Sequence, residues 1–135
     1  HNRAYCEKVI ALIKQYDLEK QIIFSGKIPY NSMPNIYKKA RFVIFASRTE
    51  NCPNILLEAL SLNCLILCSN FKPMPEFGED AVIYFNPNNP QELAEYMHKI
   101  VSKEIDCLPI ISRTSSLKPE DKTGSRSNDH TSSVK

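Results

Sequence analysis

Three short apolar runs, separated by segments of helical periodicity, constrain the fold of this chain more than any other feature. The runs cover residues 41–46, 64–68 and 81–85, and each is nearly continuous in apolar residues, as is typical of strands covered on both faces. A fourth run, at 21–25, is rich in β-forming residues and stops at Gly26. Strands separated by helical segments of roughly 10–20 residues indicate right-handed βαβ units. The sequence therefore predicts an α/β fold with a Rossmann-like parallel sheet and flanking helices.

Helices are predicted around these strands, because apolar residues recur there at helical spacing. The predicted helices cover residues 5–16, 33–40, 53–62 and 90–101. The first is expected to bury a stripe made of Tyr5, Val9, Leu12, Ile13 and Tyr16. The last has a clear start, with Asn89 as N-cap, Pro90 at the first helical position and Glu92 reaching back to the cap.

The composition changes near Cys107, and this change sets the predicted domain boundary. From residue 113 to 135 the only aliphatic residues are Leu117 and Val134, whereas nine residues are Ser or Thr. Such a segment cannot bury enough apolar surface to offset the entropy lost on ordering. We therefore expect a single Rossmann-like domain over residues 1–104 and a disordered polar tail over 105–135, with no core contacts from residue 113 onward.

Charge and cysteine content exclude several functional classes. The chain carries 17 basic and 15 acidic side chains, and the two kinds are interspersed, unlike the clustered Lys and Arg of a nucleic-acid surface. The five cysteines form no CxxC pair and have no accompanying His ligands, which argues against a disulfide framework and against zinc. We expect reduced thiols in a cytoplasmic protein, with no metal ion and no cofactor.

The segment after the run at 41–46 gives the sharpest signal for a ligand site, because ligands of open parallel sheets bind beyond the carboxyl ends of the strands. Pro53 suits the first turn of a helix, which would leave the amides of Asn54 and Ile55, and at most that of Leu56, free to hold an anion such as a diphosphate. Glu50 lies just before this helix, where its carboxylate could cap free amides or accept hydrogen bonds from sugar hydroxyls. Glu58 lies among aliphatic residues within the helix and calls for a polar partner.

Both glutamates also have a purely structural interpretation. Glu50 could be a helix-terminal charge that contributes a few tenths of a kcal/mol to stability. Glu58 could lie on a solvent-facing stripe beside Ser61. The spacing of the residues leaves both interpretations open.

The stretch from Glu50 to Ile66 (ENCPNILLEALSLNCLI) resembles the signature of the retaining glycosyltransferases with the two-Rossmann B-type fold, in which two glutamates are separated by seven residues. The resemblance continues in order along the chain, over roughly residues 3–103. It includes the segments 24–26, 36–47 and 75–87. The similar region is the donor-binding domain of that family.

The resemblance implies a role for each matching position. Glu50 would accept hydrogen bonds from the hydroxyls of the donor sugar, and Glu58 would bind the ribose hydroxyls. The backbone amides of Asn54 and Ile55 would hold the diphosphate. The loop at Gly26 and Lys27 would lie near the base. The implied partners are a nucleoside-diphosphate sugar and a glycan or lipid acceptor, with peripheral membrane association through an N-terminal domain.

The sequence departs from the family pattern in three respects. Asn51 and Cys52 replace a glycine that often precedes the helix, and Asn63 replaces the glycine that usually ends it, although Asn also suits that cap. More importantly, the strand–helix–strand segment that carries an Arg and a Lys for the departing diphosphate is absent, as is the acceptor-binding domain. Without those cations, several kcal/mol of transition-state stabilisation would be missing.

We therefore expect an incomplete donor-binding domain from a retaining glycosyltransferase, inactive by itself. In the family strand order, 3-2-1-4-5-6, residues 21–25 would not pair with 42–46. The chain would then be marginally stable, with little or no affinity for a nucleotide sugar. The alternatives are a non-catalytic nucleotide- or partner-binding fragment, and another enzyme on the same scaffold, such as a sugar-nucleotide epimerase or a phosphorylase.

Overall fold

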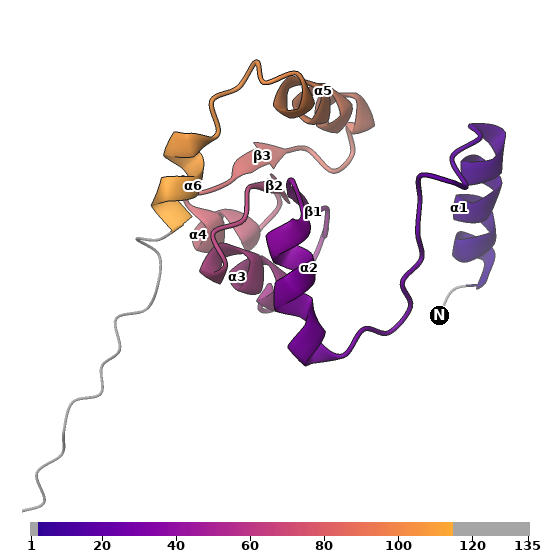
Figure 1. Ribbon diagram of the computed structural model, residues 1–135, viewed down its shortest axis with the longest axis horizontal. Coiled ribbons are helices and arrows are strands. Elements are labelled where there is room, and N and C mark those ends of the chain that lie inside the picture. Colours follow the sequence, from indigo (N-terminus) through magenta and orange to yellow (C-terminus); the bar gives the residue numbers. More distant parts are fainter. Residues whose placement is uncertain (1–2, 115–135) are drawn as a thin grey trace, which may run out of the picture. The chain divides into compact units, whose positions relative to one another are not determined.

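The computed structural model describes residues 3–114, and the chain divides into two units, residues 1–33 and 34–135. The first unit contains the helix α1 (Arg3–Gln15) and the 3-10 helix η1 (Tyr30–Ser32). The second contains a sheet and its flanking helices (Figure 1).

The first unit differs from the sequence prediction in one element. Residues 21–25 form no strand, and Ile23 and Phe24 are 83% and 69% exposed. A strand is held by hydrogen bonds to a neighbouring strand, and no described residue provides one for this segment. The predicted helix is present as α1, and within this unit its residue Ile13 is buried.

The second unit is built on three parallel strands in the order β1-β2-β3. They are β1 (Val43–Phe45), β2 (Ile66–Ser69) and β3 (Ile83–Phe85). The register pairs Ile44 with Leu67 and Cys68 with Tyr84. The parallel sheet confirms the predicted α/β, Rossmann-like class.

Helices cover both faces of this sheet (Figure 1). The helices are α2 (Met33–Lys39), α3 (Asn54–Ser61), α4 (Met74–Gly78), α5 (Pro90–Val101) and α6 (Leu108–Thr114). Leu65 and Leu67 form a core cluster with Phe85 and Ile100, against which α5 and α6 pack. Side chains alternate along a strand, so the fully buried Ile66 and Cys68 face the other way, where α3 and α4 contact β2.

Helix α3 ends at a left-handed asparagine, as the sequence predicts. Asn63 has a φ of 56°. Its amide donates to the carbonyl of Leu60 at 3.0 Å, and the amide of Cys64 donates to the carbonyl of Ala59 at 3.1 Å. These two bonds make a Schellman motif, which directs the chain from the helix into β2.

The start of α5 is confirmed, apart from one hydrogen bond. The side chain of Asn89 accepts from the amide of Glu92 at 3.3 Å. The carboxylate of Glu92 does not return to Asn89, however, and instead accepts from the amide of Asn86 at 2.9 Å. The amide of Asn89 already donates to the carbonyl of Asn86, so Glu92 fixes the turn before the helix.

The predicted domain boundary at residue 104 lies too early in the chain. Helix α6 follows it, and Cys107, Ile110 and Ile111 pack against the core cluster. Thr114 is 1% exposed, and its hydroxyl donates to the carbonyl of Ile111 at 2.6 Å. The apolar residues just before 113 hold this turn against the sheet. The rest of the predicted tail, 115–135, lies outside the described residues.

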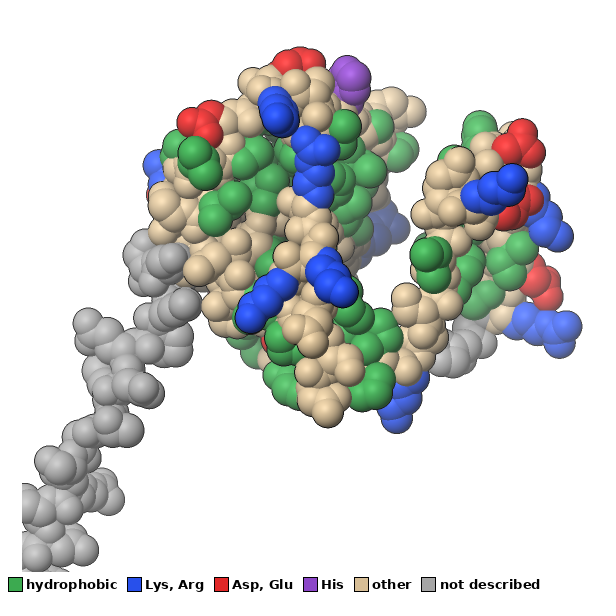
Figure 2. All heavy atoms as spheres, in the orientation of Figure 1, with side chains coloured by type: hydrophobic (Ala, Val, Ile, Leu, Met, Phe, Trp, Pro, Cys, Tyr) green, Lys and Arg blue, Asp and Glu red, His purple; other side chains and the backbone are tan. Residues whose placement is uncertain are grey.

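The surface of the second unit has no concentrated basic patch on the face that Figure 2 shows, where Lys and Arg side chains are spread among hydrophobic ones. Among residues 3–114, no helix is both long enough and apolar enough to cross a membrane.

Candidate functional site

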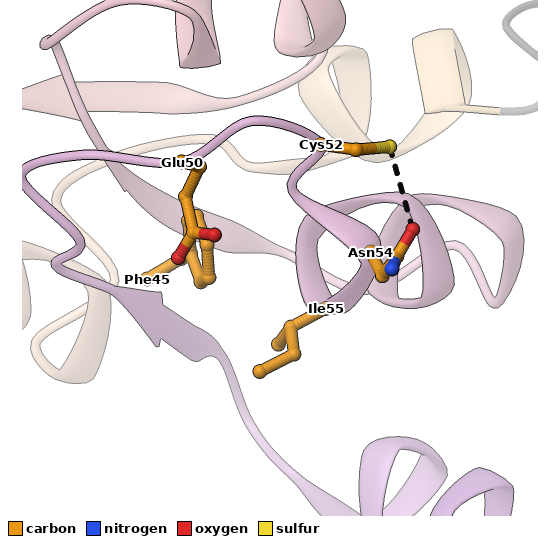
Figure 3. Close-up of a pocket in the computed structure, with 5 residues that line it drawn as sticks. All are labelled: Phe45, Glu50, Cys52, Asn54 and Ile55. Atoms are coloured by element: carbon orange, nitrogen blue, oxygen red, sulfur yellow. Dashed lines mark hydrogen bonds between the residues drawn. The ribbon is translucent and has the colours of Figure 1, made fainter.

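A cavity of about 220 Å³ lies where β1 ends and α3 begins (Figure 3). Its lining consists of Phe45, Glu50, Cys52, Asn54 and Ile55. Phe45 is the last residue of β1, and Asn54 is the first of α3. The cavity therefore lies at the carboxyl edge of the parallel sheet, the edge at which ligands bind in such folds.

Glu50 is brought to this cavity by the loop that leaves β1. Its side chain is partly buried, and it extends toward Phe45, while Ile55 reaches toward the same opening from the first turn of α3 (Figure 3). The structure thus places Glu50 beside the start of the predicted helix. A carboxylate in this position can accept hydrogen bonds from hydroxyl groups of a bound molecule.

The start of α3 differs from the prediction in its hydrogen bonds. Pro53 is the N-cap, with φ −81° and ψ 68°, which is the geometry of an inverse γ-turn. The turn closes by a bond of 2.9 Å from the amide of Asn54 to the carbonyl of Cys52. The expectation of a free amide at Asn54 is therefore wrong. Among the described residues, the amides of Ile55 and Leu56 have no acceptor, as expected in a first helical turn.

The side chain of Asn54 supplies polar atoms that the backbone amide does not. Its Oδ1 accepts from the thiol of Cys52 at 3.4 Å, which leaves the Nδ2 group with two N–H donors. Both side chains line the cavity (Figure 3). The α3 end of the cavity thus offers donors, and Glu50 offers acceptors.

Glu58 does not line the cavity, but it lies on the adjoining part of the same helix. It follows Asn54 by four residues and Ile55 by three, and residues at these spacings share a helix face. The hydroxyl of Tyr37, on α2, donates to Oε2 of Glu58 at 3.4 Å. The polar partner that the sequence required for Glu58 is therefore a tyrosine from the preceding helix.

Gly26 and Lys27 belong to the first unit, and Glu50 belongs to the second. Gly26 has a left-handed φ of 62°, and nothing lies within 4 Å of where a Cβ would be. Lys27 is exposed. Their proposed position near the base stays a prediction.

Three residues near the site were not predicted as site residues from the sequence. Phe45 and Cys52 line the cavity, and Tyr37 bonds Glu58. Phe45 is the last residue of an apolar run, and Cys52 sits between Glu50 and Pro53, so proximity in sequence could have indicated both. Nothing in the sequence pattern could have shown which residue would meet Glu58 across two helices.

Another contact joins the loops after β1 and β3. The Nη2 atom of Arg48 donates to Oδ1 of Asn88. This bond links two strand-end loops on the side of the sheet where the cavity lies. Within residues 3–114, no group of three or more His, Cys, Asp and Glu side chains could hold a metal ion.

Comparison with known proteins gives a family match over most of the chain. The model of the family described as "Glycosyl transferases group 1" matches residues 2–115, and this range includes α6.

Two curated relatives are serotype-specific mannosyltransferase WbdA of Escherichia coli and an N-acetylgalactosaminyltransferase of Campylobacter jejuni that acts on a diphospho-undecaprenol-linked sugar. WbdA is 30% identical over 101 residues, which cover 73% of this chain and 12% of the relative. The C. jejuni enzyme is 33% identical over 78 residues, which cover 55% of this chain and 20% of the relative. The matched part is thus a small fraction of either relative.

A solved structure has the same fold. It is the C-terminal domain of a group 1 glycosyltransferase, LpcC, from Francisella tularensis. Its TM-score is 0.73 at 24% sequence identity, covering 86% of this chain and 61% of that chain.

Proposed function

This chain belongs to the group 1 glycosyltransferase family, and we propose that it supplies the donor side of an enzyme that transfers a sugar from a nucleoside diphosphate to a glycan or lipid acceptor with retention of configuration. The observation that carries this proposal is the cavity at the carboxyl edge of the sheet, which joins Glu50 to the first turn of α3. A carboxylate beside free helix amides suits a ligand that carries both hydroxyls and phosphates.

The proposed roles divide along the helix. Glu50 accepts hydrogen bonds from hydroxyls of the donor sugar. The diphosphate lies at the start of α3, where the amides of Ile55 and Leu56 and the Nδ2 group of Asn54 are its donors. Glu58, one turn further, binds the ribose hydroxyls. Such donors act most strongly where negative charge develops on the departing diphosphate.

The cavity also indicates how well residues 1–135 would bind by themselves. At about 220 Å³, it is smaller than the roughly 300–1,000 Å³ of typical ligand pockets. We therefore propose weak binding of a nucleoside diphosphate and no sugar transfer by these residues alone. A measurable transfer rate from the 135-residue chain would contradict this part of the proposal.

The test of the catalytic role uses an enzyme that carries these residues together with an acceptor-binding domain. Glu50→Gln should lower transfer by at least about 10-fold, because hydrogen bonds to a charged group contribute roughly 1.5–3 kcal/mol. Glu95→Gln is the matched control, since Glu95 is an exposed carboxylate on α5. Unchanged transfer in Glu50→Gln would return Glu50 to the role of a helix-terminal charge.

Retention is tested separately, by NMR of the product. The anomeric configuration of the transferred sugar should equal that of the donor. An inverted product would refute the retaining mechanism and leave the family membership intact. Binding of a nucleotide without any transfer in the longer enzyme would favour the non-catalytic alternative.

A further inference from the structure

We propose that Tyr37 is a positioning residue for Glu58, which holds the carboxylate in place before the ribose binds. The inference rests on the proposed role of Glu58 at the ribose. It starts from the bond of 3.4 Å between the Tyr37 hydroxyl and Oε2 of Glu58. This bond joins residues 21 positions apart, one on α2 and one on α3.

The tyrosine is better fixed than the glutamate that it contacts. Tyr37 is 4% exposed, whereas Glu58 is partly exposed. The backbone carbonyl of Tyr37 also accepts from the amide of Ala40 at 3.1 Å and from the thiol of Cys64 at 3.7 Å. These bonds hold the end of α2 next to the end of α3. A rigid, buried donor can therefore orient a more mobile acceptor.

The chemistry of the pair gives the bond a direction. An ionised carboxylate only accepts hydrogen bonds, so in this pair the phenol hydroxyl of Tyr37, a residue that is 4% exposed, is the donor. Glu58 accepts this hydrogen bond with one lone pair of Oε2. Within residues 3–114 the Glu58 carboxylate accepts no other hydrogen bond, so Oε1 and the remaining lone pair of Oε2 can accept from ligand hydroxyls.

Positioning would improve ligand binding through entropy. A glutamate side chain has three rotatable bonds and loses conformational freedom when its carboxylate is fixed by a ligand. Tyr37 removes part of that freedom in the unliganded chain. Without its hydroxyl, Glu58 would still bind ribose hydroxyls, but less selectively. The bond is long for an O–H···O contact, so the expected effect is modest.

The test measures the preference for ribose over 2′-deoxyribose. The 135-residue chain is titrated with UDP, GDP and ADP and with their 2′-deoxy forms, and binding is followed by NMR chemical shifts, which detect millimolar affinities. Glu58→Ala should abolish the preference. Tyr37→Phe should lower it by about 3-fold to 10-fold, the range expected for one hydrogen bond, and should have no further effect in the Glu58→Ala background.

Tyr84→Phe is the matched control for the loss of a hydroxyl. Tyr84 also carries a buried hydroxyl, and that hydroxyl has no partner among the described residues. The variant should keep the wild-type preference. A lowered preference in Tyr84→Phe would show that any buried tyrosine hydroxyl matters, and would overturn the specific role of Tyr37.

The remaining outcomes separate this inference from the function on which it rests. A wild-type preference in Tyr37→Phe, with the preference lost in Glu58→Ala, would overturn the positioning role and leave the ribose role of Glu58 intact. A preference that persists in Glu58→Ala, or no nucleotide binding at all, would refute the donor-site proposal and this inference with it.

Discussion

Gly78 and Tyr84 form a contact whose energetic consequence can be worked out from the structure. Gly78 ends α4, and a Cβ at this position would lie 2.7 Å from the hydroxyl oxygen of Tyr84 and 3.0 Å from a methyl carbon of Val82. The first distance is too short for any carbon–oxygen contact. We therefore predict that Gly78→Ala destabilises the chain, although alanine is normally the better helix residue.

The magnitude follows from two opposing terms. Replacing a glycine at a compatible position stabilises by roughly 0.5–1 kcal/mol, mainly by restricting the unfolded chain. Forcing an extra carbon into a filled space costs about 1–3 kcal/mol. The clash is larger, so the net loss in the free energy of unfolding should be about 1–2 kcal/mol.

Tyr84→Phe tests the cause of that loss. The Tyr84 hydroxyl is buried with no partner in the described part of the chain, so its removal should be neutral or stabilise by up to about 1 kcal/mol. In the Gly78→Ala background, Tyr84→Phe also removes the closest clash. The substitution should therefore raise the free energy of unfolding by about 1 kcal/mol more there than in the wild type. The contact to Val82 remains, so recovery is incomplete.

Urea unfolding followed by circular dichroism measures all four proteins of this cycle, with a constant m-value as the check that the unfolded states are comparable. If the Gly78→Ala variant is more stable than the wild type, the predicted clash is refuted. Purely additive effects of the two substitutions would mean that Tyr84 is not what the new methyl group meets.

Two further predictions concern stability. Arg41→Met should lower the free energy of unfolding by about 1–2 kcal/mol, because the Arg41 guanidinium donates at 3.1 and 3.0 Å to the carbonyls of Ile100 and Val101 at the end of α5. The stability of Arg41→Lys should lie between those of the wild type and Arg41→Met, and equal stability of all three proteins in urea would contradict the capping role. Burial raises the pKa of Cys68 from 9.0 to about 12, so the contribution of the neutral thiol to stability should be complete below pH 9.0 and be lost as the pH rises toward 12. Cys68→Ala should therefore flatten the fall of the unfolding midpoint at alkaline pH, and an equal fall in the wild type and the variant would count against this cause.

The sequence predicted the sheet well because the signals were local. A nearly continuous apolar run is what a strand buried on both faces requires, and β2, with all four residues buried, has that pattern. The caps at Asn63 and Asn89 were predictable for the same reason, since each depends on the conformation or the side chain of one residue.

The failures occurred where a residue depends on a distant partner. The run at 21–25 has strand composition, but no described strand pairs with it. Glu92 could bond either Asn89 or Asn86, and only the turn geometry decides between them. The polar composition of 113–135 does not extend back to residue 105, because Ile110 and Ile111 are apolar and pack on the core cluster, which makes α6 part of the domain.

The candidate site was predictable in part. The spacing of Glu50 to the helix start placed it beside Asn54 and Ile55, which line the same cavity. Of the amides expected to be free, those of Ile55 and Leu56 have no acceptor among the described residues, whereas that of Asn54 is bonded, because Pro53 closes a γ-turn instead of beginning the helix. Backbone detail of this kind depends on φ and ψ values that the residue types do not fix.

The hydroxyl of Thr114 shares its single proton between the carbonyl of Ile111 and Oδ1 of Asn63, which lies at 2.9 Å. The shared bond ties α6 to the turn that follows α3. Opening either helix breaks this bond, so the two should open together and their amides should exchange hydrogen as one cooperative unit. A ligand that stabilises α3 at its first turn would then slow exchange in α6 as well. Protection in a helix that touches no ligand would thus report on occupancy of the site.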